Sequence, residues 1–321
     1  MSKFIYFYSF ELIMFLKYMF MRIFFVIVAI PFLFIACGGQ GLNVDSDNVD
    51  PNEVNNIDPN IIDSDAPINT EIGGKMFSIP SPVQMSLMLK DEIGIFNEEM
   101  ITDPENVSSY TTTYKKAINM GVYGADLGYS TIFENNTKAL SYLSSVEGLA
   151  DELGIAGAFD EALIERFIEN GNNQDSMLVI MSDGYREGDK FLKDNEQHDI
   201  ATLILTGGWI ESLYFATTSY NQKNSQDIAN RIGEQKSSLL TIIELLEDYN
   251  KDEFYSQLIE DLKDLKIDFD QVVYNYQFIN PQTVESQGLT VIKSKTSVSI
   301  DKETMDNIVA KVSVIREKLI K

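Results

Sequence analysis

The chain has 321 residues and is strongly acidic, with 49 acidic and 25 basic side chains and a formal net charge of −24 at pH 7. Such a surface repels phosphate backbones, so we expect no nucleic-acid partner. A single cysteine excludes an internal disulfide, and a single histidine, His198, excludes a zinc site built from several nitrogen and sulfur ligands. We expect no metal and no cofactor, and we expect His198 to lie in a solvated linker between helices.

The first 36 residues form an apolar leader. Met21-Arg22 supplies a positive start, and residues 23–35 are apolar, which is the pattern of an export signal. The end of this run, Phe34-Ile35-Ala36-Cys37, resembles a bacterial lipoprotein signal. That resemblance implies that residues 1–36 are removed, that the thiol of Cys37 is diacylated and that the new amino terminus is acylated as well. A true start at Met19 or Met21 would give the leader its usual length.

A transmembrane anchor is the rival interpretation of this leader, because the apolar region from Phe4 to Ile35 exceeds the roughly 20 residues that span a bilayer. Charged residues interrupt that region at Glu11, Lys17 and Arg22, which favours the cleaved signal. Cleavage would leave 22 basic and 48 acidic side chains, a balance of −26. We therefore expect membrane contact through the lipid and not through the protein surface.

The residue after the cysteine bears on location. Gly38 and not Asp follows Cys37, which in familiar lipoprotein sorting argues against retention at the inner membrane. The expected location is the bacterial cell envelope, at the outer membrane, on either its periplasmic or its exterior face.

Residues 37–77 are predicted to be an acidic, disordered tether. The segment is rich in Asn, Asp, Gly and Pro with isolated aliphatic residues, and it cannot bury enough apolar surface to offset the entropy of ordering. The run from Asp45 to Asp50 resembles the start of a calcium loop, but Val49 takes a ligand position and no bidentate Glu follows. We interpret the run as a polar spacer.

Residues 78–321 are predicted to form a single all-α domain, because apolar residues recur there every three or four positions. Ser81-Pro82 marks the first helix start, and glycines at 121, 154 and 171 are expected helix ends. The expected apolar stripes run through Val83–Ile93, Val107–Ile118, Ile132–Ala150, Phe159–Phe167, Leu178–Leu192, Ile228–Tyr249, Phe254–Leu265 and Asp301 to the end.

Two segments depart from that pattern. Residues 201–220 are apolar in nearly every direction around a helix axis, so this helix is expected in the middle of the domain. Residues 287–300 alternate as a strand does and predict a small β-hairpin or extended arm. Short connections imply antiparallel neighbours, so the expected architecture is an irregular antiparallel helical bundle or a stack of helix pairs.

Two carboxylates stand among apolar and aromatic residues next to glycines, and they are the best candidates for a site. Asp126 lies in the segment Tyr110–Tyr129 and Glu211 in Leu203–Glu211. A carboxylate buried alone costs several kcal/mol, so we expect both acids to be paired inside the bundle, with Lys115, Lys116 or tyrosine hydroxyls as partners. The alternative is that they line a pocket for a small polar or sugar-like ligand. The residues named for either role are Tyr110, Tyr114, Lys115, Asp126, Trp209 and Glu211.

Three segments carry a resemblance to a family. Ile79-Pro80-Ser81-Pro82 with Met85, the Tyr110–Tyr129 segment and Leu203–Glu211 resemble a group of helical lipoproteins of the Bacteroidota. The resemblance covers most of the chain after the leader and brings no catalytic residues with it.

We expect a non-catalytic interaction or envelope module with a protein partner. The second hypothesis is a solute- or glycan-binding lipoprotein, and the third is a helical hydrolase that uses paired carboxylates.

Overall fold

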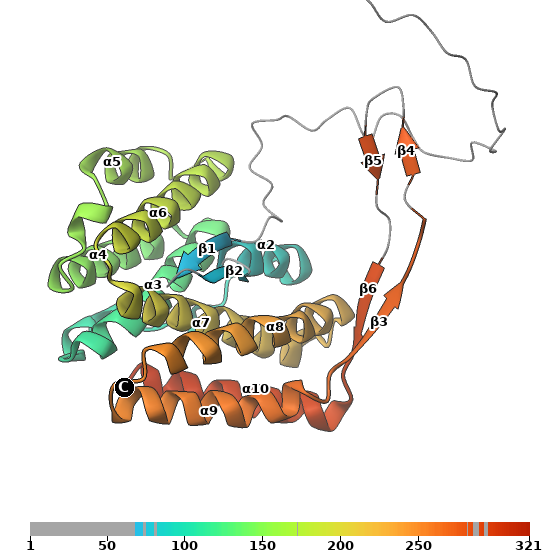
Figure 1. The fold of residues 1–321 in the computed structure, drawn as a ribbon. Helices are drawn as coiled ribbons and strands as arrows, with labels where there is room; N and C mark the ends of the chain where they lie inside the picture. Colours follow the sequence, from blue (N-terminus) through green and yellow to red (C-terminus); the bar gives the residue numbers. More distant parts are fainter. Residues whose placement is uncertain are drawn as a thin grey trace, which may run out of the picture. The chain divides into compact units, whose positions relative to one another are not determined.

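The structure is a computed structural model that describes residues 68–72, 75–79, 82–171, 173–280, 282–284, 289–291 and 295–321. Every described residue belongs to one compact unit, residues 58–321. The leader and Cys37 lie outside the described residues. The expected all-α fold is confirmed (Figure 1). The α-helices are α2 (Pro82–Ile93), α3 (Thr113–Ile132), α4 (Asn136–Glu152), α5 (Glu161–Glu169), α6 (Gln174–Asp194), α7 (His198–Lys223), α8 (Gln226–Asp248), α9 (Glu253–Phe269) and α10 (Lys302–Leu319).

Helix α7 is the centre of the domain, as its apolar sequence predicted. It is largely buried and packs against α2, α3, α6, α8 and α10. Its length and composition would also allow it to cross a membrane, but a buried core helix meets the same criterion. His198 is the first residue of this helix, at the end of the connection from α6.

The expected helix end at Gly121 is wrong, because α3 continues through it to Ile132. A Cβ on Gly121 would lie 2.0 Å from the carbonyl oxygen of Ile204, and one on Gly207 would lie 1.9 Å from that of Ile118. These glycines let the backbones of α3 and α7 touch, so they serve helix packing and not termination. The expected stripe from Ile132 to Ala150 is divided as well, because Ile132 ends α3 and α4 begins at Asn136.

The other two expected helix ends are in place. Gly154 has φ +73° directly after the end of α4, and Gly171 follows the end of α5. Short 3-10 helices lie in two of the connections: η1 (Glu98–Met100) and η2 (Pro104–Ser109) between α2 and α3, and η3 (Ala156–Ala158) between α4 and α5.

Three two-stranded antiparallel sheets accompany the helices in the described part of the chain. Strands β1 (Ile68–Ile72) and β2 (Lys75–Ile79) pair across Gly73-Gly74. The expectation of a tether up to residue 77 is therefore wrong for the strand residues. Composition predicted disorder there, but two glycines between short β-prone runs are a hairpin signal.

The strands expected at 287–300 are present, but their partners lie earlier in the sequence. Strand β6 (Lys295–Ser299) pairs with β3 (Val273–Gln277), and β5 (Leu289–Val291) pairs with β4 (Gln282–Val284). Figure 1 shows β3 and β6 side by side where the chain leaves α9 and returns to α10. We call the β3–β6 pair the ribbon. Its base is fixed to α8, because Tyr274 donates a hydrogen bond to the carbonyl of Gly233 at 2.8 Å.

Candidate functional site

The two candidate carboxylates meet in the interior of the domain. Asp126 projects from α3 and Glu211 from α7, and both side chains are completely buried. The close contact between these two helices, which the glycines permit, brings the acids together. They therefore belong to one site.

Arg316 of α10 is the cation that compensates them. Its Nε lies 2.6 Å from Oε2 of Glu211, and its Nη2 lies 2.7 Å from Oε1. This two-point contact is the strongest geometry for an arginine–carboxylate pair. The guanidinium also lies over the ring of Tyr214, 4.1 Å from its centroid. The ion pair joins the last helix of the chain to the central one.

Thr102, in the connection between η1 and η2, closes the site. Its backbone N–H donates to Oδ2 of Asp126 at 3.2 Å, and its hydroxyl accepts from Nη2 of Arg316 at 2.9 Å. Nη2 also donates to the carbonyl of Met100 at 3.1 Å. The Tyr142 hydroxyl donates to the carbonyl of Thr102, which fixes the same connection to α4. We call Thr102, Asp126, Glu211 and Arg316 the buried network.

Two buried carboxyl groups share one guanidinium in the buried network. Burial and the adjacent Glu211 carboxylate raise the pKa of Asp126 well above its usual range, while Arg316 opposes that shift. The raised pKa favours the protonated form of Asp126, which can donate a hydrogen bond to Glu211. Among the described residues, Oδ1 of Asp126 has no hydrogen-bond partner, whereas Oδ2 accepts from Thr102, so Oδ1 is the oxygen that a proton would take.

The remaining candidates lie at three separate places. Tyr110 is buried and donates to the carbonyl of Ile320 at 3.3 Å, at the end of α10. Tyr114 stacks on Phe254, with the ring centroids 5.9 Å apart, and a hydrogen bond with Asp252 raises its pKa. The backbone N–H of Lys115 donates to the capping hydroxyl of Thr112.

The lysines expected as partners of the acids do not reach them in the described structure. Lys116 pairs instead with Glu152 at 2.6 Å. Arg316, which sequence reasoning missed, takes that place. A signal was available, because Arg316 follows Val312 by four residues and precedes Leu319 by three, which puts a charge on the apolar face of a helix.

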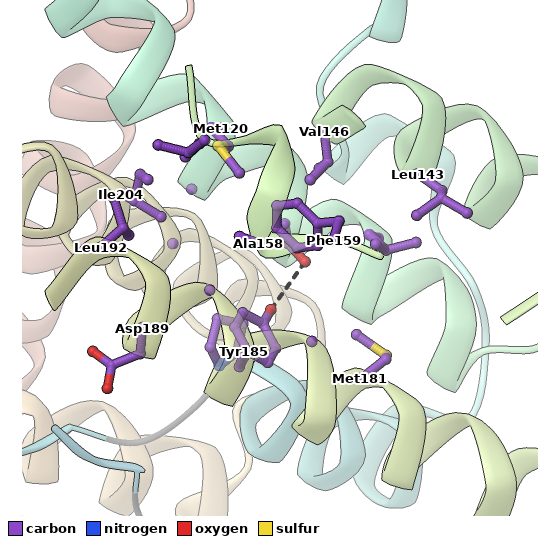
Figure 2. Close-up of a pocket in the computed structure, with 18 of the residues that line it drawn as sticks. Met120, Leu143, Val146, Ala158, Phe159, Met181, Tyr185, Asp189, Leu192 and Ile204 are labelled. Carbon is purple, nitrogen blue, oxygen red and sulfur yellow. Dashed lines mark hydrogen bonds between the residues drawn. The ribbon is translucent and has the colours of Figure 1, made fainter. Parts of the chain in front are cut away.

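Trp209 belongs to a different feature, an apolar cavity. Its indole N–H donates to Oε1 of Gln235 at 3.1 Å, and its ring lines a cavity of about 210 Å³. Figure 2 shows side chains of α3, α4, α6 and α7 around this space, including Met120, Val146, Met181 and Ile204. Sequence reasoning predicted a polar or aromatic pocket and not this one.

The arrangement supplies no metal site, since no group of three or more metal-ligating side chains occurs in the part of the chain that the structure describes. Comparisons with protein-family models, with curated proteins and with solved structures find no match to this chain.

Proposed function

We propose that this chain is a lipid-anchored protein of the bacterial cell envelope that acts by binding another envelope protein and does not catalyse a reaction. The anchor rests on the sequence, in which the lone Cys37 ends an apolar leader. Two or three acyl chains, at about 0.8 kcal/mol for each buried CH₂, would hold the protein on a membrane. We place the anchor in the outer membrane because Gly38 follows the cysteine.

The observation that carries the binding role is an exposed aromatic face on the ribbon. Side chains alternate along a strand, so Tyr274 and Tyr276 share one face of β3, and Phe278 continues it. Tyr274 is fixed to α8, whereas Tyr276 is 65% exposed and Phe278 is 64% exposed. Large aromatic side chains left together in solvent are typical of a protein interface.

The ribbon also supports a protein partner through its backbone. A two-stranded sheet has an unpaired edge on each side, and such edges bind extended segments of other proteins. The net charge of −26 expected after cleavage disfavours anionic lipid headgroups and nucleic acid as partners. We therefore expect a neutral or basic protein segment on this face.

A photo-crosslinking amino acid at position 276 or 278 tests this interface in the native envelope. Positions 275 and 277 face the other way on the same strand and are the matched controls. We expect one discrete protein adduct from 276 and 278 and none from 275 and 277. Equal adducts from all four positions, or adducts with lipid only, would contradict the proposal.

The anchor has its own test. Mass spectrometry of the protein from its native envelope should find an amino-terminal Cys37 that carries acyl chains. Cys37→Ala should release the protein into the soluble fraction. A retained leader, or a mature terminus without acyl chains, would contradict the anchor without affecting the ribbon interface.

A solute-binding role is the second candidate, and the cavity beside Trp209 is the observation in its favour. The cavity is lined by apolar side chains, so it supports an apolar ligand better than a glycan. The hydrolase hypothesis has less support, because Asp126 and Glu211 are completely buried and the bidentate contact with Arg316 occupies Glu211.

A further inference from the structure

The cavity beside Trp209 lies between two parts of the domain. One wall is formed by α3 and α7, the helices of the core, and the other by η3, α5 and α6. Its lining is almost entirely aliphatic and aromatic (Figure 2). Such walls favour apolar molecules, as a model cavity of about 150 Å³ that binds benzene does.

Three glycines keep this space open. A Cβ on Gly124 would have its nearest neighbour at 3.9 Å, one on Gly184 at 3.5 Å and one on Gly188 at 3.9 Å. An alanine would therefore fit at each position without a clash. Gly184 and Gly188 are one helical turn apart on α6 and also lower its helix propensity. Close packing does not require these glycines, in contrast to Gly121 and Gly207.

The segment from η3 through α5 covers one side of the cavity. Ala158, Phe159, Leu163, Ile164 and Phe167 of this segment line the space. Helix α5 packs mainly on α6 and has few other close neighbours. A short helix that is attached on one side can move outward and admit a molecule, whereas α3 and α7 are fixed by the core.

The charged residue at the cavity restricts which polar group a ligand can carry. Asp189 is the one charged residue in the lining, and it lies at the edge of the space (Figure 2). Its carboxylate forms an ion pair with Lys193 at 2.5 Å. The Tyr185 hydroxyl is engaged as well, because it donates to the carbonyl of Gly124 at 3.2 Å. A ligand hydroxyl can donate to Asp189, whereas a ligand carboxylate would have to compete with Asp189 for Lys193.

We propose that this cavity binds the hydrocarbon part of a single-chain amphiphile whose polar end is an uncharged hydroxyl lying near Asp189. Scaling from benzene in about 150 Å³ gives roughly eight or nine carbon atoms for a space of this size. Two acyl chains of a membrane lipid would not fit. The proposal depends on neither the lipid anchor nor the ribbon interface.

Trp209 provides a direct measurement, because it is the only tryptophan in the chain and lines the cavity. The full chain carrying Cys37→Ser, which has no acyl chain of its own, is titrated with 9-bromononan-1-ol. Bromine quenches indole fluorescence on contact, so we expect saturable quenching that unbrominated nonan-1-ol reverses by competition. Quenching that is absent, or that rises linearly without saturation, would overturn the proposal.

Gly184→Leu should abolish the saturable quenching by filling the cavity. The matched control is Gly148→Leu, because a Cβ on Gly148 of α4 meets nothing within 4 Å and that position is exposed. Circular dichroism checks that both variants fold, and Gly184→Ala replaces Gly184→Leu if the larger residue prevents folding. Equal loss of quenching in both leucine variants, or quenching that persists in a folded Gly184→Leu protein, would contradict binding in this cavity.

Two further probes test the polar end of the ligand and whether its hydrocarbon chain belongs to a membrane lipid. Nonanoate should compete with 9-bromononan-1-ol at least tenfold more weakly than nonan-1-ol does. Asp189→Asn should reduce this difference in affinity between the two competitors. Equal competition by the two probes in the unmodified cavity would refute the assignment near Asp189. Phosphatidylcholine vesicles should not compete. Competition by vesicles would contradict a single-chain ligand and would indicate that the cavity binds a membrane lipid.

Discussion

Arg316 and Glu211 form a two-point ion pair in the interior of the domain, with contacts of 2.6 and 2.7 Å that join α10 to α7. The two residues are 105 positions apart in the sequence. Removing either partner leaves a buried charge without compensation, which costs about 3–5 kcal/mol.

Arg316→Met should therefore lower the free energy of unfolding by about 3–5 kcal/mol. Glu211→Leu together with Arg316→Met should cost less than the sum of the two single changes, because no isolated charge remains. Urea denaturation of the four proteins in a double-mutant cycle measures the difference. Strict additivity would mean that the two side chains do not interact.

Asp126→Asn should change how stability depends on pH. The pKa of Asp126 is raised in the folded protein, so its contribution to stability is complete below its unfolded pKa and is lost as the pH rises through the folded value. Asparagine can accept from Thr102 and donate to Glu211 as the protonated acid does. The variant should lose less stability than the parent chain between pH 4 and pH 8.

Thermal unfolding at several pH values measures this effect. Asp301→Asn is a useful comparison, because Asp301 is an exposed cap whose pKa is lowered by hydrogen bonds from Thr304. The contribution of Asp301 to stability is present at neutral pH and is lost as the pH falls, which is opposite to the pH dependence expected for Asp126. Parallel curves for Asp126→Asn and the parent chain would show that Asp126 is ionised in the folded state.

Gly207→Ala should be severely destabilising, because its Cβ would lie 1.9 Å from the carbonyl oxygen of Ile118. The helices α3 and α7 would have to separate, so we expect a loss of more than about 3 kcal/mol, beyond the usual range for a point mutation. Gly148→Ala, in open space on α4, should stabilise by about 0.5–1 kcal/mol. Guanidinium denaturation of both variants checks the contrast, and similar effects of the two changes would be inconsistent with a backbone contact at Gly207.

Gly184→Ala should stabilise the protein, by about 0.5–1 kcal/mol from helix propensity alone, while it weakens the quenching of Trp209. The added methyl group would lie 3.5 Å from Cδ2 of Leu163, an ordinary contact. A rise in melting temperature with weaker ligand binding is the pattern of a space kept open at the expense of stability. A fall in melting temperature would show that the helix does not tolerate this methyl group.

The sequence alone determined the helical class, the central position of the helix after His198 and the burial of two acids in the interior. Each depends on local pattern, because the 3.6-residue period, the all-round apolar face of α7 and the cost of burying a lone carboxylate are visible in the residues themselves. The sequence also predicted a hairpin or extended arm over residues 287–300, where the strands Leu289–Val291 and Lys295–Ser299 lie, but it did not predict their partners.

Only the tertiary structure decided which distant residues pack against these predicted elements. The roles of glycines 121 and 207 depend on a neighbouring backbone, and the partner of Glu211 comes from a helix 105 residues away. The cavity is lined by Gly124 of α3 and by Gly184 and Gly188 of α6, together with side chains of α5 and α7. Contacts between distant segments set all three features, and a local sequence period carries no information about which distant segment will pack against it.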